Sequence, residues 1–261
     1  MTTLTYTLSD SATMLRRNLR HMRRYPSMTL MLLGMPIIFL LLFVYVFGGT
    51  LGAGLGGVSG GRSAYANYVA PGIILLTMAA AAQGTAISVA VDMTEGIIAR
   101  FRTMAIARVS VLTGHVLGSM IQTMLSLAVV IAVAVGVGFR PTAGPLAWFA
   151  AIGVLAMTAF ALIWLSVALG LAAKSVETAS NSPMFLMLLP FLGSGFVPAQ
   201  SMPTGLRWFA EYQPFTPVTE SLRGLLLGGP VGHDVAIAAA WCAGVALFGY
   251  LWAKKRYARQ P

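Results

Sequence analysis

Long apolar stretches alternate with short polar connections along this chain. Six of these stretches carry no acidic or basic residue other than histidine: Met28–Phe47, Tyr68–Val91, Val111–Phe139, Leu146–Ala173, Thr178–Val197 and Val235–Ala253. A helix of about 20 residues crosses the hydrocarbon core of a bilayer, which is about 30 Å thick. The pattern therefore predicts an all-α integral membrane protein with six transmembrane helices.

The basic residues between the stretches are crowded on one side and sparse on the other. One side has thirteen Lys and Arg residues: Arg16, Arg17, Arg20, Arg23, Arg24, Arg100, Arg102, Arg108, Lys174, Lys254, Lys255, Arg256 and Arg259. The other side has four: Arg62, Arg140, Arg207 and Arg223. Because cytoplasmic connections are enriched in Lys and Arg, both termini are expected to be cytoplasmic, which agrees with an even number of spans.

Composition limits the class of protein further. Charged residues make up 9% of the chain and hydrophobic residues 57%, whereas soluble domains contain about 25% charged residues. The net charge of +10 arises from residues that flank the spans, so we interpret them as topology signals and contacts to membrane lipids rather than to nucleic acid. The single Cys242 permits no internal disulfide and no thiolate metal cluster, and the polar first ten residues predict no cleaved signal peptide. We expect one membrane domain over residues 1–261.

Two segments near the N-terminus have distinctive patterns. Ser11–Arg24 places leucines and arginines at helical spacing, which predicts an amphipathic elbow helix over residues 11–25 in the cytoplasmic interface. It is either a topology anchor alone or a contact to a cytoplasmic partner as well. Gly48–Gly61 is rich in glycine and is expected to be a flexible external loop.

The connection after the second stretch, residues 92–110, has the pattern of a docking segment. Gly96 should bend the helix that leaves the membrane, and beyond it Ile97, Phe101 and Met104 share one helical face. A short helix with a hydrophobic knob and the flanking Arg100 suits a groove on another protein. The alternative is a solvated interfacial helix.

The fifth stretch is interrupted by Pro183 and Pro190, each of which removes a backbone donor. Such a helix must face protein or a cavity, so it is the candidate for lining a transport path. Its candidate lining residues are apolar, although core packing is the alternative role: Met184, Phe185, Met187 and Phe191.

The 37 residues from Pro198 to Asp234 are too apolar for a solvated loop and predict two short re-entrant helices on the external side. The first covers Thr204–Glu211. The second is expected to start with Thr216 as N-cap and to end at Gly228. On the second helix Glu220 and Arg223 are three residues apart and can form an ion pair.

Several kinds of chemistry leave no trace in the sequence. There is no P-loop motif and no cluster with metal-ligand spacing, and all seven acidic residues are expected to lie in connections or in the N-terminal segment. We interpret His115 and His233 as interfacial or capping residues, and Gln83 and Gln122 as donors of interhelical hydrogen bonds. The chain thus has the pattern of a translocation path without an energy source, which indicates a separate motor.

Two segments resemble a known family. The run Glu95-Gly96-Ile97-Ile98-Ala99-Arg100-Phe101-Arg102, with Arg108 beyond it, looks like the cytoplasmic coupling region of ABC-2 type permeases of the daunorubicin-resistance type. The segments Phe196-Val197-Pro198, Met202-Pro203 and 213–228 resemble the region before the last span of that family. Together with the elbow helix and the six spans, the resemblance covers nearly the whole chain.

The resemblance implies the membrane subunit of a bacterial exporter in the plasma membrane, which has no catalytic residue of its own. Two permeases, identical or paralogous, would pair above two ABC ATPase subunits that bind ATP and Mg²⁺. They would move a hydrophobic or amphipathic compound outward by alternating access at the permease interface. The ATPase-coupling residues would be Glu95, Gly96, Arg100, Phe101 and Arg102, and the residues of the external gate would be Pro214, Pro217, Glu220 and Arg223.

This chain departs from the family pattern at Ala99, where relatives often have an acidic residue, and at Ala105, where they often have a proline. Both changes lie in the expected coupling helix and would alter its charge contacts and its exit angle. Two other classes remain as alternatives to the exporter: a motor-independent channel or scaffold, and a membrane-embedded enzyme.

Overall fold

The computed structural model describes residues 26–56, 61–95 and 108–259, and it has no strand within these ranges. The helices follow one another along the chain as α2 (Pro26–Leu41), the π-helix η1 (Leu42–Phe47), α3 (Gly48–Gly56), α4 (Arg62–Thr94), α6 (Arg108–Val137), α7 (Pro145–Ala172), α8 (Val176–Asn181), α9 (Met184–Leu188), the 3-10 turn η3 (Ala199–Ser201), α10 (Thr204–Tyr212), α11 (Phe215–Leu227) and α12 (Asp234–Arg259).

Five helical segments of the described residues are long and apolar enough to cross a membrane: Leu32–Gly52, Arg62–Thr94, Thr113–Val137, Pro145–Ala172 and Asp234–Ala258. The all-α membrane architecture is therefore confirmed. The remaining expected span, Thr178–Val197, forms α8, α9 and a series of turns instead of one long helix. The count of six spans and the side on which the termini lie stay predictions. The expected elbow helix lies outside the described residues.

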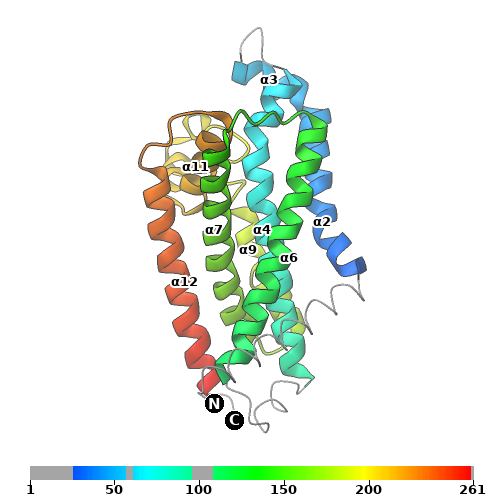
Figure 1. Cartoon of the computed structure of the whole chain (residues 1–261), viewed down its shortest axis with the longest axis vertical. Coiled ribbons are helices and arrows are strands. Elements are labelled where there is room, and N and C mark those ends of the chain that lie inside the picture. The colour runs from blue at the N-terminus through cyan, green and yellow to red at the C-terminus, as the bar shows by residue number, and fades with distance from the viewer. Residues whose placement is uncertain (1–25, 57–60, 96–107, 260–261) are drawn as a thin grey trace.

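The long helices stand side by side in one bundle with α4 at its centre (Figure 1). Within the most apolar part of α4, 78% of the residues are buried, against 28% for the corresponding part of α6 and 17% for α12. We call the end where α4 and α7 finish and α6 starts the basic end, because Lys174, Lys254 and Lys255 lie there. The opposite end, which carries α3 and α11, is the α11 end.

Small residues let the helices of the bundle approach closely. The middle of α4 reads Ala79-Ala80-Ala81-Ala82, and all four side chains are buried. A Cβ atom added at Gly170 of α7 would lie 2.6 Å from the carbonyl oxygen of Ala86 in α4, so only glycine fits at this crossing. A Cβ atom added at Gly249 of α12 would lie 2.6 Å from the backbone nitrogen of Leu165 in α7. The central helix is thus packed tightly against α7, and α7 against α12.

Two local predictions were wrong. The glycine-rich segment after the first span was expected to be a loop, but Gly48–Gly56 is helical and packs against α4. A Cβ atom at Gly52 would overlap the carbonyl group of Gly61, so glycine serves close packing there rather than flexibility. Helix α11 starts at Phe215 and not after Thr216, whose hydroxyl group donates a hydrogen bond to the carbonyl oxygen of Ala210 instead of capping.

The expected end of α11 is confirmed. Gly228 has φ +74°, the left-handed conformation that a glycine adopts without strain after a helix. The expected interhelical bond of Gln83 is also confirmed, because its Nε2 atom donates to the carbonyl oxygen of Ser180 at 2.7 Å.

Candidate functional site

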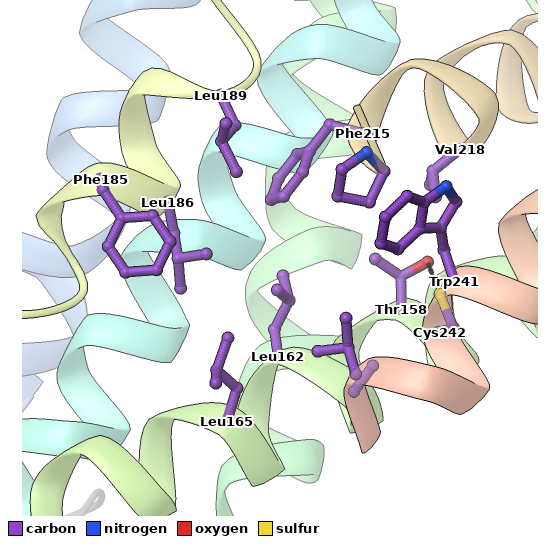
Figure 2. A pocket seen from close by; sticks show the side chains of 13 residues that line it. Thr158, Leu162, Leu165, Phe185, Leu186, Leu189, Phe215, Val218, Trp241 and Cys242 are labelled. Atoms are coloured by element: carbon purple, nitrogen blue, oxygen red, sulfur yellow. Dashed lines mark hydrogen bonds between the residues drawn. The ribbon is translucent and has the colours of Figure 1, made fainter. Parts of the chain in front are cut away.

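An apolar cavity of about 160 Å³ lies among α7, α9, α11 and α12 (Figure 2). Its walls are almost entirely hydrocarbon: Thr158, Ala161, Leu162, Leu165, Phe185, Leu186, Leu189, Pro214, Phe215, Val218, Trp241, Cys242 and Val245. The one hydroxyl group among them, on Thr158, donates to the carbonyl oxygen of Val154 at 2.8 Å. An apolar cavity of about 150 Å³ can accommodate a benzene ring. This cavity can therefore hold an apolar group of about that size.

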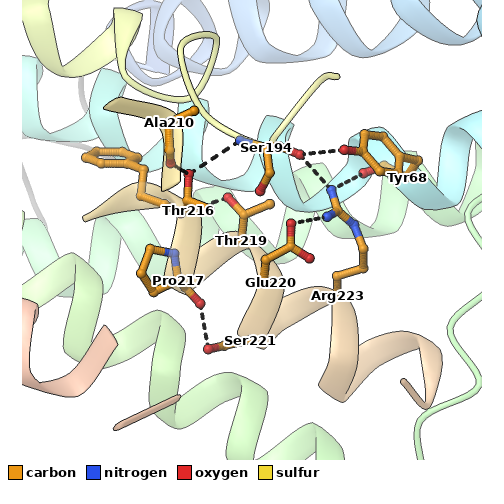
Figure 3. Close-up of polar contacts among 10 residues, drawn as sticks. Tyr68, Ser194, Ala210, Thr216, Pro217, Thr219, Glu220, Ser221 and Arg223 are labelled. Atoms are coloured by element: carbon orange, nitrogen blue, oxygen red, sulfur yellow. Dashed lines mark hydrogen bonds and ion pairs between the residues drawn. The ribbon is translucent and has the colours of Figure 1, made fainter. Parts of the chain in front are cut away.

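The turns after α9 lie between α4 and α11 at the α11 end of the bundle (Figure 3). We call residues 189–197 the inter-helix turn. Its backbone passes very close to α4, because a Cβ atom added at Gly72 would lie 2.5 Å from the carbonyl oxygen of Gly195. A Cβ atom at Gly195 would in turn lie 2.8 Å from the carbonyl oxygen of Pro190. Both glycines are required for this arrangement.

Arg223 of α11 fastens the inter-helix turn to α4. One guanidinium nitrogen, Nη2, donates to the carbonyl oxygens of Ser194 at 2.9 Å and Tyr68 at 3.2 Å, and Nη1 pairs with Glu220 at 2.5 Å. The guanidinium carbon also lies 3.9 Å from the centre of the Tyr68 ring, which is a cation–π contact. The Tyr68 hydroxyl group donates to the same Ser194 carbonyl oxygen at 3.0 Å. The side chain thus joins three segments that are distant in sequence.

Further polar contacts join the inter-helix turn to the start of α11. The Gln213 Nε2 atom donates to the carbonyl oxygen of Leu189 at 2.9 Å, and the Ser194 backbone N–H group donates to the Thr216 hydroxyl oxygen at 3.4 Å. Among the described residues, three buried polar atoms of this network have no hydrogen-bond partner: Ser194 Oγ, Gln213 Oε1 and Arg223 Nε. A buried polar atom without a partner costs about 1–3 kcal/mol, so these three atoms oppose the packing that the other contacts stabilise.

An aromatic cluster holds the other face of the inter-helix turn. Phe191 and Phe196 stack with ring centroids 4.4 Å apart, and Phe43 packs on Phe196 at 4.8 Å. Phe43 belongs to the π-helix η1, a rare widened turn that occurs frequently at functional sites. The turn is therefore held by apolar contacts on the side of the first span and by hydrogen bonds on the side of α11.

At the basic end, a buried contact between a histidine and an aspartate joins α4 to α6. The Nε2 atom of His115 lies 3.0 Å from the Oδ2 atom of Asp92, and the two side chains are 7% and 10% exposed. The prediction that Asp92 belongs to a connection is wrong, because it lies in the last turn of α4 and its side chain is buried. His115 lies near the start of its span, as expected, but its side chain is buried against protein. Asp92 follows the buried Val89 by three residues, and this spacing could have predicted its burial.

Comparison with known proteins identifies the family. The sequence profile described as ABC-2 type transporter matches residues 11–227, which is most of the chain. The chain belongs to the ABC-2 type transporter family. It is therefore a multi-pass transport subunit of the bacterial plasma membrane.

Two relatives of this ABC-2 permease have names that refer to drug resistance. The daunorubicin resistance ABC transporter permease protein DrrB1 of Streptomyces coeruleorubidus is 28% identical over 246 residues, which cover 94% of this chain and 84% of the relative. The probable doxorubicin resistance ABC transporter permease protein DrrC of Mycobacterium tuberculosis is 25% identical over 175 residues, which cover 66% of this chain and 63% of the relative. This permease is similar in sequence to both proteins.

The predicted path-lining residues of the permease do not share one surface. Phe185 lies on the wall of the cavity, but Phe191 belongs to the aromatic cluster. Met187 is partly buried and packs against the larger cluster of buried apolar residues in the bundle. Met184 is 56% exposed on the outside of the bundle. The path-lining role of these four residues stays a prediction, and the structure brings only Phe185 to a cavity.

The predicted gate and coupling residues are described to different extents. Glu220 and Arg223 form the expected ion pair, Pro214 lies on the wall of the cavity, and the carbonyl oxygen of Pro217 accepts the Ser221 hydroxyl group. Glu95 follows α4 directly and is exposed. The other expected coupling residues, Gly96, Arg100, Phe101 and Arg102, lie outside the described residues.

Proposed function

We propose that this chain is the membrane-spanning subunit of an ATP-driven exporter that moves a hydrophobic or amphipathic compound out of a bacterial cell. The observation that carries the proposal is the pair of hydrogen bonds from Arg223 to the carbonyl oxygens of Tyr68 and Ser194, which we call the Arg223 lock. The lock fastens the inter-helix turn to α4, the helix that leads to the expected coupling region. The transport role follows from the family, and the names of the relatives support a drug-like cargo.

The energy source is a pair of separate ABC ATPase subunits that bind ATP and Mg²⁺. They dock at the basic end, which is cytoplasmic, and contact the segment that begins at Glu95. The second permease of the complex is an identical or paralogous chain. Alternating access at the interface between the two permeases carries the cargo.

The mechanism uses α4 as the moving element. In the resting state the inter-helix turn is closed against α4 by the contacts of Arg223 and by the close approach at Gly72. Movement of α4 by the ATPase pulls the Tyr68 carbonyl group and Gly72 away from this turn. The turn and α11 then open the external side, and the polar atoms that lacked partners become hydrated.

The apolar cavity supports the class of cargo. Its lining is almost entirely apolar, so it favours hydrocarbon and aromatic groups over sugars or ions. Its walls include Phe185 of the segment expected to line the path and Phe215 of α11. A compound with a flat apolar ring is thus better suited to this permease than a strongly polar one.

The decisive experiment has two parts. The tagged chain is first purified from its native membrane in mild detergent, and mass spectrometry identifies the proteins that accompany it. A P-loop ATPase in near-equal amount is expected, together with either the same permease or a paralogue. If the chain is recovered folded and alone even after cross-linking, the exporter is excluded and the channel alternative is tested next.

The purified complex is then reconstituted into vesicles with a fluorescent hydrophobic amine as cargo. ATP-dependent accumulation should disappear when the P-loop lysine of the ATPase is replaced by alanine, which serves as the matched control. Equal cargo movement with and without ATP would contradict the exporter and favour a motor-independent channel.

A further inference from the structure

The Asp92–His115 pair is a buried contact between oppositely charged residue types at the basic end. The two side chains meet at 3.0 Å and are shielded almost completely from solvent. Each belongs to a different helix, α4 or α6, and these helices are consecutive in the described part of the chain. The pair therefore joins the two helices that precede and follow the connection of residues 96–107.

The surroundings of the pair make it strong and directional. It lies beside a cluster of buried apolar residues from α4, α6, α7 and α12, which includes Val89, Val116 and Tyr257. In such surroundings water screens the contact less than it would at the surface, so the contact is electrostatically stronger. The nitrogen–oxygen contact also fixes the register of α4 on α6, which apolar packing alone does not.

The pair is also near one end of a long helix. Helix α4 extends from Tyr68 to Asp92 over about 36 Å at 1.5 Å per residue and contains Pro71 close to Tyr68. Along this length it is packed closely against α7 at Gly170 and against the inter-helix turn at Gly72. A displacement of α4 at the basic end is therefore transmitted along the helix to the contacts of Arg223 at the α11 end.

We propose that Asp92 and His115 are positioning residues that bind α4 to α6, so that the ATPase moves both helices as one unit. This inference rests on the proposed exporter function. Neither residue contacts cargo or nucleotide; the pair converts a push on the connection into movement of α4. Without it, α4 and α6 keep their apolar packing but lose this fixed contact at the basic end, and ATP hydrolysis is poorly coupled to opening of the inter-helix turn.

The test measures cargo transported per ATP hydrolysed by the reconstituted complex with the ATPase. Asp92→Asn and His115→Gln keep the approximate shape of each side chain but weaken the pair. The double variant Asp92→His with His115→Asp exchanges the two groups and can restore it. The matched controls are His233→Gln and Asp234→Asn at the start of α12, at the α11 end, where His233 is exposed and Asp234 partly so.

The single variants should lower transport per ATP by about 2- to 30-fold, the range found for residues that couple distant sites. The exchange variant should recover most of the wild-type ratio, and the two controls should leave it unchanged. A further double variant, Asp92→Leu with His115→Phe, replaces the pair by apolar packing, which often preserves stability. It should be inserted and folded normally but remain uncoupled, which a purely structural role does not predict.

Two results would overturn the inference. One is wild-type transport per ATP by the apolar double variant. The other is an exchange variant that is folded at normal membrane levels but no better coupled than the single variants. If the single variants fail to fold, the two double variants still decide the matter. Failure of the exporter function itself is seen separately, because the wild-type complex would then show no ATP-dependent transport.

Discussion

Replacing Arg223 by methionine should open the α11 end of the permease. Methionine fills a similar volume but cannot donate the hydrogen bonds to the carbonyl oxygens of Tyr68 and Ser194. It also removes the cation–π contact with the Tyr68 ring. Glu220, which is 34% exposed at its side chain, loses its partner but can be hydrated. The substitution therefore weakens the closed arrangement specifically.

The size of the effect follows from these contacts. A hydrogen bond from a charged group contributes about 1.5–3 kcal/mol, so the two bonds to carbonyl oxygens contribute roughly 3–6 kcal/mol. The Arg223 side chain is 16% exposed, and competition with water places the loss near the lower limit, at about 3 kcal/mol. A change of that size raises the ratio of open to closed protein by about 100-fold, since each 1.4 kcal/mol is a factor of ten.

A cysteine at position 194 can report the opening. The Ser194 hydroxyl group makes no hydrogen bond, so Ser194→Cys removes no polar contact, and the residue is only 4% exposed in the closed arrangement. The native Cys242 is first replaced by alanine, which leaves the Thr158 hydroxyl group bonded to the Val154 carbonyl oxygen. The rate of reaction with a membrane-impermeant thiol reagent added to intact cells is then proportional to the open fraction.

Arg207→Met is the matched control, because it breaks the Arg207–Glu211 pair on α10. Both side chains of that pair are more than 40% exposed, at 47% and 43%. We expect the Arg223 variant to raise the reaction rate of Ser194→Cys by about 100-fold and the control to leave it within about twofold. Equal rates in both variants, in protein that is folded and inserted, would refute the assignment of Arg223 as a lock.

Three further predictions follow from the same structure. Gly72→Ala should lower the thermal stability of the purified permease and slow transport. Its Cβ atom would lie 2.5 Å from a carbonyl oxygen, and such overpacking costs about 1–3 kcal/mol. The control is Gly153→Ala, whose Cβ atom would meet no atom within 4 Å. Ala161→Phe should fill the cavity and reduce transport of a hydrophobic cargo per complex, whereas Ala150→Phe on the exposed face of α7 should not. Charge reversal at Glu95 should uncouple ATP hydrolysis from transport at normal membrane levels, and wild-type transport by this variant would contradict a coupling role.

The features that could be predicted from the sequence are those set by local or one-dimensional rules. Charged residues are costly in a bilayer, so their absence located the five long helices to within a few residues in most cases. The pairing of Glu220 with Arg223 depends only on helical spacing, and the stop at Gly228 depends only on backbone conformation. None of these required knowledge of how the helices pack.

The features that the sequence did not reveal depend on contacts between distant segments. Asp92 looked like a residue of a polar connection because its partner, His115, lies on the next helix and the sequence does not state which faces meet. The glycines at 48–56 looked like a loop because composition alone does not distinguish flexibility from close packing. The prolines of the fifth stretch indicated a broken span. They did not indicate where its short helices and turns would lie, because that depends on contacts with α4 and α11.

Helix α4 connects the two ends of the permease in a way that explains its unusual composition. A helix that transmits movement must be closely supported, yet able to shift along its neighbours. Its middle consists of small residues, which allow close approach without interlocking of large side chains. Two of its polar attachments are near its ends: Asp92 to α6 at the basic end, and the carbonyl group of Tyr68 to Arg223 at the α11 end. A third, from Gln83 to the carbonyl oxygen of Ser180, lies between them. In the proposed mechanism the contact at the basic end stays intact and carries the movement into α4, whereas the contact at the α11 end breaks when the inter-helix turn opens.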